Sequence, residues 1–200
     1  MHPVRVRPTR TDRVIANAIA AHTRPPVEAA MRVATYGADE KLLLAAAGAA
    51  WIYSAWKPPL RPAATHFFAL SLASAVLPHL LKIFVDQMRP DRLTVRGHWR
   101  GVPLSGRARD AFPSGHALHM GALASAAGIL PRRDRTPVRC LSLAMSATRV
   151  ILLAHWASDV VVGFVLGGLL ERVLRRLTLR DVRPKVSQFN QGWPVPPAEP

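Results

Sequence analysis

Three groups of polar residues between positions 82 and 159 carry the side-chain types needed to bind and cleave a phosphate ester. Together they supply three fixed cations, two histidines, a carboxylate, a hydroxyl and a glycine: Lys82, Arg89, Ser114, Gly115, His116, Arg149, His155 and Asp159. Unpaired cations that leave water are costly, so three of them in one place predict an anionic ligand. Lys82 and Arg89 are seven residues apart, close to two helical turns, and we expect them on one face of a helix that Pro90 ends.

The second and third groups add what phosphoryl transfer needs besides positive charge. Ser114 is a natural helix N-cap, Gly115 lets a ligand approach the backbone, and the N-terminus of a helix attracts anions. His116 and His155 provide one side chain to attack phosphorus and another to protonate the leaving oxygen. Asp159 follows His155 by four residues, which is within reach for a carboxylate to orient the imidazole.

No metal ion or other cofactor is expected in this site. The sequence has no acidic cluster suited to magnesium and no histidine spacing typical of a metal site. The single Cys140 excludes a cysteine-based zinc cluster and a disulfide within the chain. Electrostatic stabilisation would therefore come from lysine and arginine side chains.

Five apolar stretches are the elements that must position these groups. They predict membrane-spanning helices over about 41–57, 63–84, 114–130, 138–154 and 157–175. A soluble helical bundle is the alternative, but five such stretches in 200 residues leave too little polar surface to coat it. We expect an all-α polytopic membrane bundle with five clear spans, and an N-terminal amphipathic helix that is a candidate for a sixth. Gly163, Gly167 and Gly168 fit close packing of helices in lipid.

The chain divides into three regions. Residues 1–40 are basic, and Pro25 and Pro26 split them into two short amphipathic helices expected to lie at the membrane interface. Residues 41–176 would form the membrane domain. Residues 177–200, basic at first and then proline-rich, are expected to be a disordered tail.

Counting the spans places all three polar groups on one side of the bundle. Twelve Lys and Arg residues then fall on the opposite side, against six in the loop that joins the second and third spans. The positive-inside rule puts the twelve in the cytoplasm, although the basic N-terminal segment counts the other way. We therefore expect a protein of the bacterial inner membrane whose site faces the periplasm or the cell exterior. The net charge of +15 does not predict a nucleic-acid partner, because the arginines are scattered between the spans.

The polar groups also resemble the three signature motifs of the type-2 phosphatidic acid phosphatase superfamily. The matching positions follow one another in the order of the family: Lys82-x6-Arg89-Pro90, Pro113-Ser114-Gly115-His116 and Arg149-x5-His155-x3-Asp159. One position departs from the pattern, because Thr148 stands where the family usually has serine. Threonine keeps the hydroxyl and adds a methyl near the phosphate. The first 40 and the last 25 residues lie outside the resemblance.

The resemblance implies a role for each matched residue. His155 would be the nucleophile that forms a phosphohistidine, Asp159 would orient it, and His116 would be the general acid toward the lipid leaving group. The remaining matched residues would bind the phosphate: Lys82, Arg89, Ser114, Gly115 and Arg149. Small membrane members of the family are metal-independent and usually have six helices.

These observations predict an integral membrane phosphatase that releases inorganic phosphate from a phosphomonoester or pyrophosphate on a lipid. Undecaprenyl pyrophosphate, phosphatidic acid and phosphatidylglycerol phosphate are the expected substrates, and the sequence does not choose among them. The expected partners are this phosphorylated lipid and the membrane lipids, with no nucleic acid, and the oligomeric state is left open. The alternatives are a lipid phosphotransferase or a vanadate-dependent haloperoxidase of the same superfamily, and a non-enzymatic scaffold that binds anionic lipid through its arginines.

Overall fold

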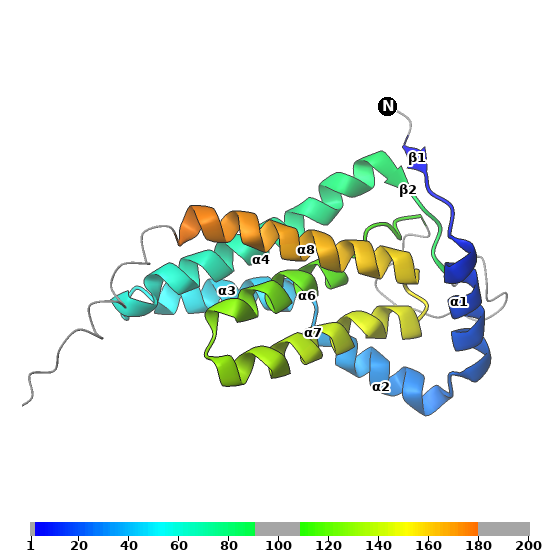
Figure 1. The fold of residues 1–200 in the computed structure, drawn as a ribbon, viewed down its shortest axis with the longest axis horizontal. Helices are drawn as coiled ribbons and strands as arrows, with labels where there is room; N and C mark the ends of the chain where they lie inside the picture. The colour runs from blue at the N-terminus through cyan, green and yellow to red at the C-terminus, as the bar shows by residue number, and fades with distance from the viewer. Residues whose placement is uncertain (1–2, 91–108, 180–200) are drawn as a thin grey trace, which may run out of the picture.

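The computed structural model describes residues 3–90 and 109–179, and most of this part of the chain is helical (Figure 1). Its elements in chain order are β1 (Val4–Arg5), α1 (Arg10–His22), α2 (Pro25–Tyr36), α3 (Glu40–Tyr53), the 3-10 helix η1 (Pro58–Leu60), α4 (Arg61–Phe84), β2 (Val85–Asp86), α6 (Gly115–Ala126), the 3-10 helix η3 (Ala127–Ile129), α7 (Arg132–Ile151) and α8 (Ala157–Thr178). The tail predicted to be disordered lies almost entirely outside the described residues.

Helices occupy all five of the predicted apolar stretches. Helices α3, α4, α6, α7 and α8 fall on them in that order, and the prediction of a helical bundle is confirmed. Among the described residues, the segment Pro58–Phe84 is the one that is long and apolar enough to cross a membrane by the criteria of length and composition. The count of five or six spans therefore stays a prediction.

The N-terminal region forms the two short helices predicted for it. Helix α2 begins at Pro25, where the missing N–H of proline costs nothing because the first helical N–H groups have no partner within the helix. A feature that the sequence did not predict is a parallel pair of two-residue strands, in which Val4 pairs with Val85 and Arg5 with Asp86. This strand pair connects residues 4–5 to the segment that follows α4.

Helices α6 and α8 pack backbone against backbone at the centre of the molecule. A Cβ atom at Gly167 would overlap the carbonyl oxygen of Leu118, and one at Gly163 would overlap that of Ser114. On the opposing helix, a Cβ at Gly121 would overlap the carbonyl of Phe164. Glycine is required at these positions because no side chain fits between the helices. The predicted close packing therefore holds for Gly163 and Gly167, whereas a Cβ at Gly168 would make only an ordinary contact, 3.8 Å from the carbonyl oxygen of Gly121.

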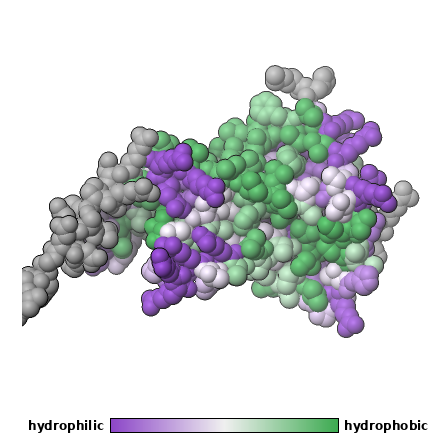
Figure 2. Space-filling model, viewed as in Figure 1, coloured by the Kyte–Doolittle hydropathy of each residue, from purple (hydrophilic) through white to green (hydrophobic). Residues whose placement is uncertain are grey.

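Large apolar side chains face outward, and several polar side chains face inward. Helix α8 exposes a stripe of aliphatic residues at intervals of four: Val161, Val165, Leu169, Val173 and Leu177. Helix α4 exposes a similar stripe, while its His66 and Ser74 are fully buried. Hydrophobic surface accordingly covers much of the middle of the molecule in Figure 2. An exposed apolar surface of this extent is typical of contact with lipid rather than with water.

Candidate active site

The three polar groups meet at one end of the bundle, where α4 ends, α7 ends, and α6 and α8 begin (Figure 1). Two hydrogen bonds to backbone carbonyls join the groups directly. The N–H of Ser114 donates to the carbonyl of Asp159 over 3.3 Å, and Nη1 of Arg89 donates to the carbonyl of Ala154 over 2.9 Å. All eight predicted site residues belong to the described part of the chain, and the fold brings them to this one end.

The first group does not share a helical face as predicted. Helix α4 ends at Phe84 rather than at Pro90, because the next two residues pair with β1. Lys82 lies in the last turn of α4, whereas Arg89 lies beyond it, outside any helix or strand. Lys82 and Arg89 are therefore brought together by a third residue that contacts both, and not by their positions on one helix.

That third residue is Asp110, which sequence analysis missed. Its carboxylate accepts from Nε and Nη2 of Arg89 at 3.0 and 2.7 Å, and Nζ of Lys82 lies 3.6 Å away. A carboxylate that touches two cations of the site holds them side by side. Asp110 precedes the second motif by three residues, so the only signal in the sequence was an acidic residue at the edge of that motif.

The second group is built as predicted around a helix N-terminus. Ser114 is the N-cap of α6, and its hydroxyl accepts from the N–H of Ala117 over 3.4 Å. Ser114 is fully buried, whereas the neighbouring Gly115 and His116 are partly exposed. A Cβ at Gly115 would make only ordinary contacts with Pro78, so no neighbouring protein atom requires glycine there. The N-terminus of α6 is open to an anion.

In the third group, a backbone carbonyl rather than the predicted carboxylate holds His155. The Nδ1 atom of His155 is 2.6 Å from the carbonyl oxygen of Ala111 and 3.8 Å from Oδ2 of Asp159. A carbonyl can only accept, so Nδ1 carries the proton and Nε2 keeps its lone pair. Within the described part of the chain Nε2 has no hydrogen-bond partner. The atom left available for attack on phosphorus is Nε2.

Asp159 stabilises the turn that carries His155. Its Oδ2 accepts from the N–H of Trp156 over 2.9 Å, and its side chain is fully buried at the start of α8. The indole Nε1 of Trp156 in turn donates to the carbonyl of Met88 over 2.7 Å. Asp159 therefore holds the backbone of Trp156, and the indole of Trp156 joins the loop between α7 and α8 to the segment that follows α4.

The environment of His155 keeps its imidazole neutral. Burial, and then the positive charges of Arg89, Arg149 and Lys82, lower the pKa of His155 well below its usual value of 6.5. The hydrogen bond to Ala111 acts in the opposite direction and is outweighed. A neutral imidazole is the form that can act as a nucleophile.

Arg149 is held from outside the motif region. It is 3% exposed, and its Nη1 donates to the hydroxyl of Thr35 in α2 over 3.3 Å. Its buried Nε has no partner among the described residues. The hydroxyl of Thr148 donates to the carbonyl of Met145 over 2.6 Å, within its own helix. The residue that departs from the family pattern therefore directs its hydroxyl away from Arg149.

A second contact from the N-terminal region reaches the start of α8. Asp12 is 2% exposed, and its two oxygens accept from the N–H and the hydroxyl of Ser158 over 2.9 and 2.8 Å. Ser158 is adjacent to Asp159. The same carboxylate accepts from the N–H and hydroxyl of Thr9, which completes a capping box at the start of α1. Sequence analysis missed Asp12 and Thr35, because neither belongs to a recognisable motif.

The described residues contain no group of three or more His, Cys, Asp or Glu side chains placed to hold a metal ion. The carboxylate nearest to the cations, Asp110, is already engaged by Arg89. The prediction that the reaction needs no metal stays a prediction.

The fold and the site define a helical-bundle protein with a cluster of cations and histidines at one end. The chain belongs to the PAP2 superfamily, whose family model matches residues 62–183. It is 35% identical over 104 residues to the lipid A 1-phosphatase of Rhizobium etli, and 34% identical over 103 residues to that of Rhizobium johnstonii. These matches cover 52% and 51% of this chain, and 45% and 42% of the two relatives. The chain thus spans less than half the length of each of these relatives.

Two solved structures share the fold. One is a transmembrane PAP2-type phosphatidylglycerolphosphate phosphatase from Bacillus subtilis, with a TM-score of 0.67 and 20% identity over 88% of both chains. The other is Aquifex aeolicus LpxE, with a TM-score of 0.65 and 18% identity over 82% of this chain and 93% of that one. At 20% and 18% identity, these two structures show that the fold is shared.

Proposed function

We propose that this protein is an integral membrane lipid phosphatase that works through a phosphohistidine on His155. The observation that carries the proposal is the buried His155, with Nδ1 on a carbonyl and Nε2 unpartnered, beside Arg89 and at the same end of the bundle as His116. The family model, the lipid A 1-phosphatase relatives and the two structural neighbours support the same class of reaction.

The reaction runs in two displacements. In the first, Nε2 of His155 attacks phosphorus, the bond from phosphorus to the lipid oxygen breaks, and His116 gives its proton to that oxygen. In the second, a water molecule attacks the phosphohistidine, His116 takes up the proton of the water, and inorganic phosphate leaves. The imidazole regains its lone pair on Nε2, so the enzyme returns to its starting state.

The phosphoryl oxygens are stabilised by cations and by the N-terminus of α6. Lys82, Arg89 and Arg149 supply fixed positive charge, and the N–H groups of Gly115 and His116 in the first turn of α6 are the backbone donors for phosphate. Fixed protein charges do here what a metal ion does in many phosphatases. We therefore propose that turnover is independent of metal.

The substrate is a lipid with a terminal phosphate, and the outward-facing apolar side chains place the protein in the membrane that holds it. The relatives widen the panel expected from sequence to four candidates: undecaprenyl pyrophosphate, phosphatidic acid, phosphatidylglycerol phosphate and the 1-phosphate of lipid A. We further propose that the site faces the periplasm or cell exterior of a bacterial inner membrane. The segments predicted on the opposite side carry twelve Lys and Arg residues, against six in the loop between the second and third predicted spans.

Phosphate release by the purified protein tests this proposal. Wild-type protein in detergent should release inorganic phosphate from at least one of the four lipids, and EDTA should leave the rate unchanged. His155→Ala should lower the rate to background. Transfer of phosphate to a second lipid instead of to water would identify a phosphotransferase. Full activity of His155→Ala, or no activity of folded protein on any lipid, would contradict the mechanism and favour a lipid-binding scaffold.

A further inference from the structure

A groove of about 650 Å³ lies between α7 and α8, at the opposite end of the bundle from His155. Helix α6 packs against both of these helices and forms the floor of the groove (Figure 1). The residues of the floor have small side chains, which leave space above α6: Gly121, Ala124, Ser125 and Gly128. The walls are apolar along most of their length, with Leu143 on α7, and Phe164, Val165 and Leu169 on α8. A volume of this size is typical of a site for a small molecule or a lipid chain.

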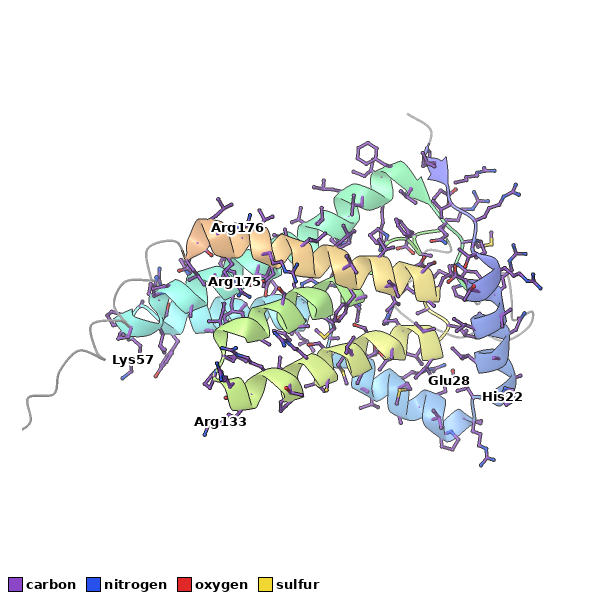
Figure 3. The ribbon with its side chains drawn as sticks, viewed as in Figure 1. His22, Glu28, Lys57, Arg133, Arg175 and Arg176 are labelled. Carbon is purple, nitrogen blue, oxygen red and sulfur yellow. The ribbon has the colours of Figure 1, made fainter. Side chains whose placement is uncertain are left out.

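Three arginines line one end of the groove. They are Arg139 on α7, and Arg172 and Arg175 on α8. Figure 3 labels Arg175 at the end of the bundle that also carries Lys57 and Arg133, far from the helices α1 and α2. Figure 2 shows hydrophilic surface gathered at this end and hydrophobic surface beyond it. Charge is thus confined to one end of an otherwise apolar groove.

The three arginines differ in how their charge is balanced. Nε of Arg175 lies 2.6 Å from Oε1 of the buried Glu171, and its Nη2 donates to the carbonyl of Ser125, so this side chain is part of the packing. Arg172 is exposed and makes no hydrogen bond or ion pair with the described residues. Arg139 is exposed and reaches only the carbonyl of Ala124, over 3.4 Å. Two guanidinium groups therefore face the groove without a carboxylate.

We infer that this groove binds an anionic phospholipid from the leaflet opposite to the catalytic site. The phosphate of its headgroup lies between Arg139 and Arg172, and one acyl chain follows the floor of α6 toward Gly121. Guanidinium groups bind phosphate through paired N–H donors, and basic pockets between membrane helices bind anionic headgroups. The inference rests on the proposed membrane-spanning arrangement and not on the proposed chemistry, because the groove contains none of the catalytic residues.

Photo-crosslinking in nanodiscs tests the site directly. Phosphatidylglycerol with a diazirine on one acyl chain is compared with phosphatidylcholine carrying the same chain, and the labelled peptides are mapped. We expect phosphatidylglycerol to label the segments of α6, α7 and α8 that line the groove, and phosphatidylcholine to label them far less. Saturating inorganic phosphate should leave the labelling in place, because the acyl chain contributes to binding. Equal labelling by the two lipids would overturn the inference.

Matched variants separate the groove from general surface charge. The double variant Arg139→Gln and Arg172→Gln should reduce labelling about tenfold or more, since each cation near the headgroup contributes on the order of a fivefold change in affinity. The double variant Arg132→Gln and Arg133→Gln removes the same charge from exposed residues that do not line the groove and should leave labelling unchanged. Equal losses in the two double variants would overturn the site.

A third variant fills the groove without altering charge. A Cβ at Gly168 meets nothing closer than 3.8 Å, so Gly168→Leu can fold and extend its side chain into the groove. This variant should abolish labelling, whereas Val173→Leu, on the exposed outer stripe of α8, should not. Persistent labelling of Gly168→Leu would contradict the placement of the acyl chain. Phosphate release by the same variants shows separately whether the proposed catalytic function stands.

Discussion

At the scale of single residues, the surroundings of His155 leave Nε2 as the nitrogen available for the proposed attack. The carbonyl of Ala111 fixes the proton on Nδ1, and burial beside three cations keeps the ring neutral. Asp159, which the sequence predicted as the direct partner of the imidazole, instead accepts from the N–H of Trp156 and secures the loop. The same carboxylate is 3.8 Å from Nδ1, close enough to stabilise the positive charge that would develop on the ring in the proposed attack.

The lowered pKa of His155 predicts how stability changes with pH. As pH falls below about 6.5, the unfolded chain protonates this histidine while the folded protein does not, so the unfolded state binds more protons. Folded wild-type protein should therefore lose stability relative to His155→Asn as pH falls through 6.5, by up to about 1.4 kcal/mol per pH unit. Thermal unfolding of both proteins in detergent at a series of pH values measures the difference. A difference that stays constant, or that grows in the other direction, would contradict a neutral His155.

At the scale of elements, the interface between α6 and α8 sets the geometry of the site. Both helices begin at the site, and the hydrogen bond from the N–H of Ser114 to the carbonyl of Asp159 ties their first turns together. Their contact is close enough that glycine is required at Gly163 and Gly167. Any shift between the helices would move His116 relative to His155.

Two neighbouring glycines of α8 give a matched test of this interface. Gly167→Ala places a Cβ on the carbonyl of Leu118 and should destabilise the protein by about 1–3 kcal/mol, with a loss of phosphatase activity. Gly168→Ala makes the same chemical change where the nearest atom is 3.8 Å away, and should be within about 0.5 kcal/mol of wild type or slightly more stable. The test is to measure the melting temperature of each variant. Similar values for the two variants would refute close packing of α6 on α8.

The N-terminal helix α1 is a second element that supports the site. Burial raises the pKa of Asp12, but the hydrogen bonds from Ser158 and Thr9 outweigh it, and the net effect is a lowered pKa. The carboxylate is therefore ionised and holds the first turn of α8 to α1.

Replacement of Asp12 should weaken both folding and turnover. Asp12→Asn removes the charge and should cost about 1–3 kcal/mol, because groups of Ser158 and Thr9 lose charge-assisted hydrogen bonds. It should lower kcat/KM by roughly tenfold, since Asp159 lies in the turn that Asp12 holds. Asp134→Asn, on a half-exposed carboxylate at the start of α7, is the control for loss of charge. If both variants behave alike, α1 does not support the site.

The helices that carry this site could largely be predicted from the sequence, but the tertiary contacts between them could not. The apolar stretches and the Ser114 cap are local patterns, so the sequence predicts the helices and places the three motifs at one end. The early end of α4 depends on pairing between Val4 and Val85, which no local pattern reveals. Asp110, Thr35 and Asp12 act through tertiary contacts across long stretches of chain, and nothing in their immediate sequence marks them.

At the scale of the whole molecule, polarity is arranged for a membrane with different chemistry at its two ends. Aliphatic stripes on α4 and α8 face outward, and fully buried polar residues such as His66 and Glu171 lie between the helices. One end gathers the histidines and cations of the proposed catalytic site. The other end carries the arginines of the groove. This arrangement would let one bundle bind a substrate from one leaflet and an anionic lipid from the other.

The most direct test of the central proposal is to trap the phosphohistidine. The protein is mixed with a lipid substrate radiolabelled at its terminal phosphate, quenched with alkali within one turnover and digested with trypsin. The label should be stable to alkali, labile to acid, and located on the peptide 150–172, whose single histidine is His155. His155→Ala should carry no label. An active wild-type enzyme with no trapped phosphate, or with phosphate on another residue, would contradict nucleophilic attack by His155.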